Sequence, residues 1–485
     1  MAPDDSWLPV QADLAVYSRL VGSKIEEDTL HGTFLGTTTE YVPNSTINFI
    51  ATQRNIRKVL NNEPSASGLS KLQKKNCATR VHRIAKRVFI ICVVHQIPMS
   101  FLLDLNHVDN ELKIPLTFTD EMLPFGNQDV GMVPGQFTKS SLDNFIPYQP
   151  YVCSPTFRLG SFDQTFSSSD ILPMKTGSSL GHGAAGDVTI VQVDKSHLFY
   201  PGSNPTTDQW SREFAMKSFK QPYLAQREMN FIQALREAGI SSNHAHLATS
   251  YGGFTCAGNS YLISEKADTN LDDYMKQTSS PPPSPSTRIW LKRQFLGLAD
   301  ALRAIHDLKP DVQAGYIHDI KPDNVLVFYT ANNPRFKWTD WGCAKVNDIK
   351  EGTSHQSRTR GAPPYNPPES INGIFSTVTS RPHDIWSLGC MYLELLVWIT
   401  EGWTSLNAFR GALGGDYNDD NNEYRHDDFH HDDKIKPEVV SKLVSVRSAQ
   451  GGTWNGVCTE IDRMLRITPS QRPRAANVVD ALKQA

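Results

Sequence analysis

Two long stretches of the chain place their hydrophobic residues at helical spacing. The first, QADLAVYSRLVGSKI at 11–25, brings near one face Leu14, Val16, Tyr17, Leu20 and Val21. The second has at the same spacing Phe295, Leu298, Ala299, Leu302 and Ile305. Recurrence about every three to four residues predicts an amphipathic helix. We therefore expect a helix near the start of the chain and another over residues 288–307.

From about Met174 the pattern changes to short strand-like runs followed by helices. In LGHGAAGDVTIVQV (180–193), the glycines precede an alternating, β-branched segment, which predicts two strands joined by the glycines. EFAMKSF (213–219) is a short apolar run of the same kind. In YIHDIKPDNVLVF (316–328), polar residues come just before three apolar ones. This order predicts a loop that holds polar groups at the mouth of a strand.

These changes of pattern divide the chain. Residues 1–150 are expected to form one mostly helical region, 151–173 a connector rich in Ser and Phe, and 174–485 a second domain. Within it, TSSPPPSPST at 278–287 predicts a surface insertion, because proline lacks an amide donor for regular structure. The polar, acidic segment 414–434 predicts a second loop.

The composition fits a soluble globular protein with more than one domain. The chain has 485 residues, of which 39% are hydrophobic and 20% charged, and its net charge is −3. No bulk field therefore draws the molecule to nucleic acid or to an anionic membrane, and we expect no nucleic-acid partner. The longest apolar run, VFIICVV at 88–94, is too short to span a bilayer.

The start of the chain and its cysteines both indicate the same cellular compartment. The start, MAPDDSWLPV, is acidic where a secretory signal would be basic and then apolar. Seven cysteines are scattered without a CxxC pair, which disfavours a structural zinc site. We therefore expect an intracellular protein, cytoplasmic or nuclear, in a reducing compartment.

Two charged segments each admit two interpretations. The segment 71–94 carries Lys71, Lys74, Lys75, Arg80, Arg83, Lys86 and Arg87. It is either a basic docking surface or, the favoured interpretation, a solvated helical face before a buried segment. The Asp and His residues of 414–434 either bind a metal or, again favoured, form a solvated insertion, since they lack a fixed ligand spacing.

Several residues of the second domain have the chemistry to bind phosphates. Gly181, Gly183 and Gly186 match G-x-G-x-x-G, and glycines allow the backbone to approach a phosphate closely. Because strands flank them, they suit a phosphate-covering hairpin better than a dinucleotide-binding turn. Lys217, in an apolar run, is either an edge-strand lysine or a paired one. Glu228, on a following helix, offers it a partner.

The segment 316–328 supplies a second group of polar residues. An aspartate such as Asp319 can accept a hydroxyl proton, Lys321 can balance phosphoryl charge, and Asn324 can ligate Mg²⁺. Sixteen residues past Asn324, Asp340 in TDWGCA offers another hard oxygen ligand. Any one of these residues suits a surface turn, but their order and spacing together are specific.

With these motifs, residues 174 to the end resemble a eukaryotic protein kinase of the Ser/Thr type. The resemblance implies an α+β, bilobal fold, with a β-rich N-lobe at about 174–265 and a helical C-lobe at about 268–485. It implies that the glycine loop covers ATP and that Lys217 pairs with Glu228. It also implies that Asp319 is the catalytic base, assisted by Lys321, and that Asn324 and Asp340 hold Mg²⁺.

Further segments carry the resemblance. PPYNPPE resembles the end of an activation segment and PHDIWSLGCMYLELL the helix that anchors the catalytic loop through Asp384, while SQRPRA implies that Arg472 pairs with Glu369. YLISEKA resembles a hinge, with Ser264 as gatekeeper. The nucleotide-binding residues implied are Gly181, Gly183, Gly186, Val188, Ala215, Lys217, Ser264, Glu265, Ala267 and Leu326.

The chain departs from the family pattern at several positions. His318 stands where the family has Arg, Trp341 where it has Phe, and Ala362 where a Thr often contacts the catalytic Asp. Lys217 and Glu228 are eleven residues apart, which is short for the family. Because His318 lacks the bidentate fork of Arg, we expect activity without phosphorylation of the activation segment.

The sequence favours an active kinase that transfers phosphate from MgATP to Ser or Thr of a protein substrate. The alternative is a pseudokinase or signalling scaffold that binds nucleotide or a partner without significant catalysis. The N-terminal region resembles that of kinase-like proteins of filamentous fungi, and we expect regulation, through a partner protein, to act on residues 1–150.

Overall fold

The computed structural model describes most of the chain in two compact units. The described residues are 7–34, 36–103, 116, 118–124, 139–183, 185–199, 209–240, 244–278, 280–281, 284–310, 312–331, 333–348, 363–371, 381–414, 428–431 and 433–485. The first unit is Met1–Gly181 with Val188–Met216 and Gly252–Gly258, and the second is His182–Asp187, Lys217–Tyr251 and Asn259–Ala485. The domain boundaries proposed from the sequence, at residues 150 and 174, stay predictions.

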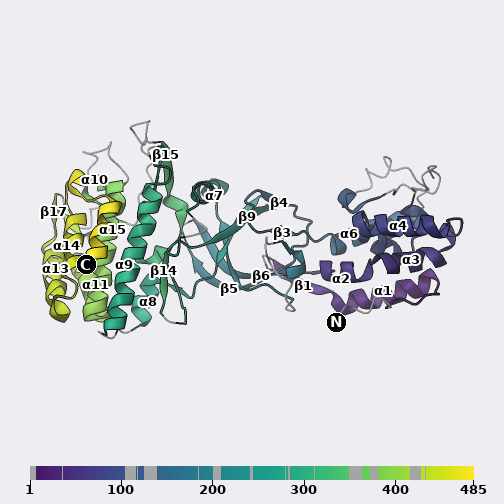
Figure 1. The fold of residues 1–485 in the computed structure, drawn as a ribbon, viewed down its shortest axis with the longest axis horizontal. Helices are drawn as coiled ribbons and strands as arrows, with labels where there is room; N and C mark the ends of the chain where they lie inside the picture. Colours follow the sequence, from purple (N-terminus) through teal and green to yellow (C-terminus); the bar gives the residue numbers. More distant parts are fainter. Residues whose placement is uncertain are drawn as a thin grey trace, which may run out of the picture. The chain divides into compact units, whose positions relative to one another are not determined.

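Helices make up most of the described residues among the first 152 (Figure 1). They are α1 (Leu14–Asp28), α2 (Asn44–Ile50), α3 (Gln53–Asn62), α4 (Lys71–Ile84), α5 (Lys86–Val94) and α6 (Lys139–Val152). The helix expected from the first apolar pattern is α1, which buries Tyr17, Val21 and Ile25. The run at 88–94 lies in α5, whose residues 88–93 are fully buried in the core of this unit.

Side-chain caps fix where these helices begin. Asp13 accepts a hydrogen bond from the Val16 amide, 2.8 Å, at the start of α1. Ser70 opens α4 with a capping box, in which Ser70 and Gln73 each bond the other's backbone amide. Such caps satisfy amides that the first helical turn leaves without partners.

The first unit also contains a sheet. A hairpin of β1 (Leu30–Phe34) and β2 (Thr37–Tyr41) lies beside β5 (Met174–His182), in the strand order β2-β1-β5-β6-β8. Here β6 is Gly186–Val193 and β8 is Phe214–Phe219. β1 runs parallel to β5 with Thr33 opposite Lys175, and the Thr176 amide donates to Thr33 Oγ1 at 3.2 Å. The hairpin was not expected from the sequence.

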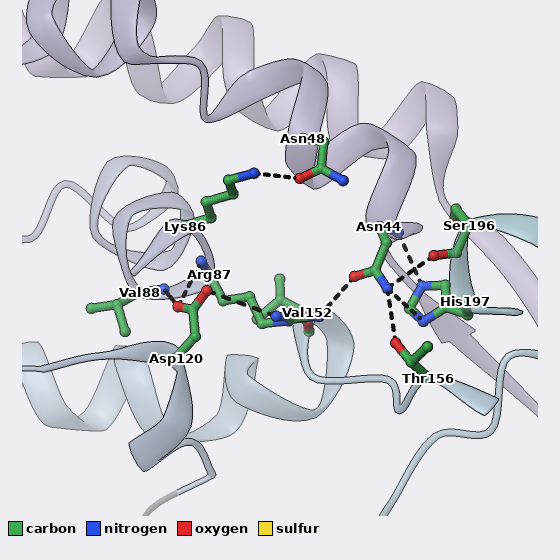
Figure 2. A network of polar contacts seen from close by, with 10 residues as sticks. All are labelled: Asn44, Asn48, Lys86, Arg87, Val88, Asp120, Val152, Thr156, Ser196 and His197. Atoms are coloured by element: carbon green, nitrogen blue, oxygen red, sulfur yellow. Dashed lines mark hydrogen bonds and ion pairs between the residues drawn. The ribbon is translucent and has the colours of Figure 1, made fainter. Parts of the chain in front are cut away.

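A polar network ties the helical residues to the segment around His197 (Figure 2). The Asn44 amide donates to His197 Nε2 at 3.0 Å, and the Asn44 side chain donates to the Ser196 carbonyl at 3.1 Å. The Arg87 guanidinium donates to Asn44 Oδ1 and to the Val152 carbonyl, each at 2.7 Å. Burial lowers the pKa of His197 to about 4, so the imidazole stays neutral and can accept a hydrogen bond.

The expected connector 151–173 contains regular structure. β3 (Phe157–Arg158) pairs in parallel with β7 (Leu198–Phe199), and β4 (Gln164–Phe166) pairs in parallel with β9 (Ser250–Cys256). Phe157, Phe166 and Phe254 pack against one another with ring centroids 5.0–5.6 Å apart. The Phe-rich composition therefore serves packing.

The second unit combines short strands with long helices (Figure 1). It contains α7 (Pro222–Glu237), followed along the chain by β10 (Asn259–Glu265). The other strands are β11 (Thr269–Asn270), β12 (Gln313–Tyr316), β13 (Val325–Phe328), β14 (Arg335–Trp338), β15 (Lys345–Asp348), β16 (His430–His431) and β17 (Lys434–Ile435). The other helices are α8 (Leu271–Gln277), α9 (Pro285–His306), α10 (Pro368–Ile371), α11 (Arg381–Glu401), α12 (Trp403–Gly414), α13 (Pro437–Ser448), α14 (Asn455–Met464) and α15 (Ala475–Gln484).

Helix α11 is the centre of this unit. Its residues 383–399 are all buried, which explains its almost uniformly apolar sequence. The helix expected over 288–307 is confirmed as α9, which Ser284 caps through the Thr287 amide at 3.2 Å. Residues 415–427 of the acidic loop lie outside the described residues. No helix in the described ranges is long and apolar enough to cross a membrane.

Candidate functional site

The glycines join two strands, as expected. β5 ends at His182 and β6 begins at Gly186, and the Gly183 amide donates to the Gly186 carbonyl at 2.8 Å. A Cβ on Gly186 would lie 2.1 Å from the Ser218 carbonyl oxygen, so only glycine fits there. Lys220 Nζ donates to the Gly183 carbonyl at 2.8 Å, which fixes one side of the turn.

Lys217 lies between two carboxylates. Its Nζ is 2.8 Å from Glu228 Oε2 and 2.9 Å from Asp340 Oδ1. The side chain of Lys217 is 14% exposed and that of Glu228 3%, whereas that of Asp340 is 39% exposed. The ion pair with Glu228 predicted from the sequence is thus present, and Asp340 is a second partner that was not predicted.

The two neighbouring carboxylates affect the pKa of Lys217 more than its burial does. Burial alone would lower its pKa, but the carboxylates of Glu228 and Asp340 raise it above the ordinary value. Burial raises the pKa of Glu228 against the opposing effect of Lys217. Burial would also raise the pKa of Asp340, yet Lys217 and the Gly342 amide hold it below the ordinary range. Lys217 stays cationic and Asp340 stays anionic at neutral pH.

The loop after β12 gathers the other predicted residues. Asn324 Nδ2 donates to Asp319 Oδ2 at 2.7 Å and to the Asp319 carbonyl at 2.8 Å. Lys321 Nζ lies 3.0 Å from Asp319 Oδ2. Because its amide nitrogen is used by Asp319, Asn324 keeps its side-chain oxygen for another partner.

Strand pairing brings this loop to Asp340. β13 and β14 are antiparallel with Val325 opposite Trp338, and the Thr339 amide donates to the Asn324 carbonyl at 3.0 Å. The residues just before β13 and just after β14 therefore lie at the same end of one hairpin. This end holds Asn324 and Asp340, sixteen positions apart in sequence.

The backbone at Asp340 is left-handed, with φ of 58°, and the Gly342 amide caps its carboxylate at 3.3 Å. Trp341 is buried and packs against Phe231 of α7, with ring centroids 5.3 Å apart. Arg227, also on α7, donates to the Cys343 carbonyl at 2.7 Å. Trp341 thus serves as the apolar anchor of this turn, and Arg227 is a contact that no sequence signal indicated.

Asp384 of α11 holds the other end of the loop. Its carboxylate, fully buried, accepts hydrogen bonds from the Ile317 amide at 2.9 Å and the His318 amide at 2.8 Å. His306 Nε2 lies 2.9 Å from the same carboxylate. The role of Asp384 as an anchor matches the expectation, while the contribution of His306 was not predicted.

His318 is half-buried beside α11. Its backbone has φ of 63°, and its ring packs edge-on against His383 with centroids 5.2 Å apart. Burial lowers the pKa of His318 below its ordinary value despite the nearby Asp384. A neutral imidazole there offers no cation for a phosphate. The segment 349–362, with Ala362 and the candidate phosphorylation sites, lies outside the described residues.

Arg472 and Glu369, which the sequence predicted to pair, are also in contact. Arg472 Nη1 and Nη2 donate to the two Glu369 oxygens at 2.6 and 2.7 Å. Both side chains are almost completely buried, at 0% and 4% exposed. This fork-to-fork geometry ties α10 to the segment before α15.

The residues of the expected hinge use some of their polar groups within the fold and leave others available to a ligand. The Glu265 amide already donates to the Thr249 carbonyl at 2.9 Å, and its side chain binds Lys337 at 2.7 Å. Its carbonyl is therefore the group it can offer to a ligand. Ser264 Oγ bonds Ser250 Oγ at 3.3 Å. Both serines are partly buried.

The other nucleotide-binding residues are placed in their elements. Ala267 follows β10, and Leu326 lies in β13; both are half-buried in the second unit. Gly181, Val188 and Ala215 belong to the first unit, on β5, β6 and β8. Their roles at a nucleotide stay predictions.

Comparison with known proteins gives one consistent family. Residues 204–481, more than half of the chain, match the protein kinase domain family. Mitogen-activated protein kinase kinase 5 of Leishmania mexicana is 27% identical over 236 residues, 48% of this chain and 38% of that protein. Serine/threonine-protein kinase NLK2 of Xenopus laevis is 33% identical over 142 residues, 29% of this chain and 28% of that protein.

A third relative, mitogen-activated protein kinase kinase kinase 1 of Arabidopsis thaliana, is 41% identical over 107 residues, 21% of this chain and 14% of that protein. The aligned parts thus span well under half of each of these relatives. The family match agrees with the geometry of Lys217, of the loop after β12 and of α11, which holds that loop through Asp384. The expected α+β protein-kinase-like fold, preceded by a helical region, is confirmed, and the chain belongs to the protein kinase family.

Proposed function

We propose that the protein is an active Ser/Thr protein kinase that uses ATP and Mg²⁺. The observation that carries the proposal is the pairing of Lys217 with Glu228 and Asp340, since Lys217 stays cationic and Asp340 stays anionic, as phosphoryl transfer requires. Lys321-Pro322 is the form that this loop takes in the Ser/Thr kinases that the chain resembles, and it supports Ser or Thr as the residue that is phosphorylated. The similarity to the serine/threonine-protein kinase NLK2 of Xenopus laevis supports the same class.

The available oxygen atoms suit Mg²⁺. Asn324 keeps its side-chain oxygen because Asp319 accepts from its nitrogen, and Asp340 is anionic and partly exposed. Hard oxygen ligands of this kind fit Mg²⁺ better than softer metals. Bound there, the ion would neutralise charge on the phosphates of ATP.

The chain's own residues supply the other functions. The Asp319 carboxylate accepts the proton of the substrate hydroxyl as that oxygen bonds to the γ-phosphorus and the bond to the β-phosphate oxygen breaks. Asn324 orients Asp319 through its 2.7 Å hydrogen bond, and Lys321, 3.0 Å away, balances the charge that moves through the site. Lys217 holds the phosphates, and the Glu265 and Ala267 backbone binds adenine.

The test is a phosphoryl-transfer assay with the full chain, γ-labelled ATP, Mg²⁺ and a generic basic protein substrate. We expect labelled Ser or Thr with wild type and none with Asp340→Ala. Omission of Mg²⁺ should have the same effect as the substitution. Label in the Asp340→Ala sample would mean that a contaminating kinase, not this chain, is responsible.

The alternative is a pseudokinase or scaffold that binds nucleotide or a partner protein without significant catalysis. It predicts nucleotide binding, measured by thermal shift with ATP, without transfer to any substrate. We favour catalysis because Lys217, Asp319 and Asp340 are all retained.

Control of activity is proposed to lie outside the activation segment, because His318 stands where the family has Arg and its half-buried imidazole has a lowered pKa. Regulation would act through residues 1–150, whose likeness to kinase-like proteins of filamentous fungi stays a prediction, as do an intracellular location and a regulatory partner.

A further inference from the structure

The helices of the first unit concentrate positive charge. Residues 44–98 contain ten lysines and arginines and a single carboxylate, Glu63, in a chain whose net charge is −3. Glu63 is buried, and its carboxylate accepts a hydrogen bond from the Ala66 amide at 3.2 Å. The one acidic side chain of this stretch is therefore used locally, and it does not neutralise the surface.

The cations divide into those that hold the fold together and those that do not. Lys86 donates to Asn48 at 2.6 Å, and Arg87 is held in the network of Figure 2. By contrast, five exposed cations make no ion pair or side-chain hydrogen bond within the described ranges: Arg54, Arg57, Lys71, Lys75 and Arg83.

Three of these five lie on one side of α4. Lys71, Lys75 and Arg83 follow the spacing of residues that share a helix face, with exposed Thr79 between them. The stripe is about 18 Å long, at 1.5 Å per residue. Leu72 lies next to it and is 50% exposed.

The placement of Lys71 and Lys75 at the start of α4 opposes what helix stability favours, whereas Arg83 lies in the last turn, where a cation is favourable. α3, α4 and α5 each have no acidic residue in the first turn, where the partial positive charge of the helix end favours carboxylates. Lys71 and Lys75 also repel each other at i, i+4. Lys71 and Lys75 lower helix stability and make no ion pair or side-chain hydrogen bond in the part of the chain that the structure describes, which is accounted for if they bind something else.

We propose that the stripe formed by Lys71, Lys75 and Arg83, together with Leu72, is a docking surface for an acidic amphipathic helix of a partner protein. Carboxylates at i and i+4 on such a helix repeat at the same spacing as the cations on α4. A partner protein suits the surface better than a polyphosphate, because exposed Leu72 gives an apolar anchor that a phosphate backbone cannot use. The proposal does not depend on phosphoryl transfer.

The test measures binding of a labelled helical peptide, with glutamates at i, i+4 and one leucine beside them, to the full chain by fluorescence anisotropy. We expect saturable binding that weakens with added salt, and no binding of the same peptide with every glutamate replaced by glutamine. Lys71→Glu/Lys75→Glu/Arg83→Glu should weaken binding about tenfold or more, since the variant opposes like charges. Leu72→Asp should weaken it as well.

A matched control reverses three exposed cations of the second unit: Lys276→Glu/Arg293→Glu/Arg335→Glu changes net charge equally and should leave peptide binding unchanged. Equal loss in both triple variants would show that only net charge matters and would overturn the proposal. Tighter binding of a DNA duplex or of phosphatidylserine vesicles than of the peptide, at the same salt, would assign the surface to a polyanion and overturn it too.

Thermal unfolding separates docking from a structural role. Because Lys71→Glu and Lys75→Glu put carboxylates in the first turns of α4, the double variant Lys71→Glu/Lys75→Glu should have a Tm equal to or above that of wild type. A lowered Tm would mean that these cations support the fold, and the docking assignment would be wrong.

Discussion

Lys217 in the second unit and Lys71 with Lys75 in the first show two opposite uses of the same side chain. Lys217 is 14% exposed and lies 2.8 and 2.9 Å from two carboxylates, whereas Lys71 and Lys75 are exposed and pair with nothing in the ranges that the structure describes. Burial makes an unpaired charge costly, so a buried lysine requires partners. An exposed lysine is already stabilised by water, and its charge stays available to another molecule. The environment of a charge, rather than its presence, thus indicates whether it acts inside the fold or outside it.

The largest expected effect concerns the two carboxylates that are proposed to act in phosphoryl transfer, Asp319 as the proton acceptor and Asp340 as a metal ligand. Asp319→Asn removes the proton acceptor, and we expect a fall in kcat of about 10²–10⁴-fold with nucleotide affinity retained. Asp340→Ala removes a metal ligand as well as a partner of Lys217, so activity and MgATP affinity should both fall. Steady-state kinetics and nucleotide titration measure the two effects. Asp480→Asn, at an exposed ion pair, is the matched control. Equal loss of nucleotide affinity in both site variants would contradict the assigned roles.

The next effect compares two arginine–carboxylate pairs. Arg472→Ala leaves Glu369 buried without its partner, and we expect the free energy of unfolding to fall by about 3–5 kcal/mol. Arg466→Ala breaks an exposed pair with Asp462 and should cost at most about 1 kcal/mol. Urea unfolding followed by tryptophan fluorescence measures both. Equal costs would remove the distinction between buried and exposed charge.

A third effect tests buried groups that stay neutral. Burial lowers the pKa of His383 from 6.5 to about 3, with His318 as a secondary cause. The unfolded chain therefore binds a proton at this side chain that the folded protein does not, between about pH 6.5 and 3. Stability should be complete above pH 6.5 and decline as the pH falls through this window. Thermal unfolding of His383→Phe should decline less over the same range, and an unchanged slope would contradict the assignment.

The smallest effect separates two neighbouring arginines of the first unit. Arg87→Met removes hydrogen bonds to Asn44 and to the Val152 carbonyl and should lower stability by about 1.5–3 kcal/mol. Arg83→Met removes an exposed cation and should stay within about 0.5 kcal/mol of wild type. Chemical denaturation measures both. If Arg83→Met cost as much, the division of cations into structural and free would be wrong.

The residues of the candidate site could be predicted from the sequence because the proposed chemistry fixes their types and spacing. Asp319, Lys321 and Asn324 share one short loop, and the β13–β14 hairpin sets the distance to Asp340. The helix α9 could be predicted equally well, because its buried face produces a regular apolar pattern in the sequence. In these cases the information is local, and a short window of sequence contains it.

Contacts between distant segments could not be predicted in the same way. Asn44 and His197 are 153 positions apart, and neither residue type indicates the other. The parallel pairing of β1 with β5 is set by tertiary packing, because β1 is a short strand containing a glycine that no local pattern distinguishes. The contacts of His306 with Asp384 and of Arg227 with Cys343 are of the same kind. Such contacts depend on which surfaces meet after the helices and strands have formed.

The pairing of β1 with β5 has a practical consequence for handling the protein. A fragment that begins at residue 174 would lack β1, and the hydrogen-bonding edge of β5 that Thr33 now occupies would be open. It would also lack Tyr41, whose hydroxyl donates to the buried Asp194 at 3.1 Å. An open strand edge is a template for pairing with other chains. Such a fragment should aggregate during expression, while the full chain keeps this edge covered.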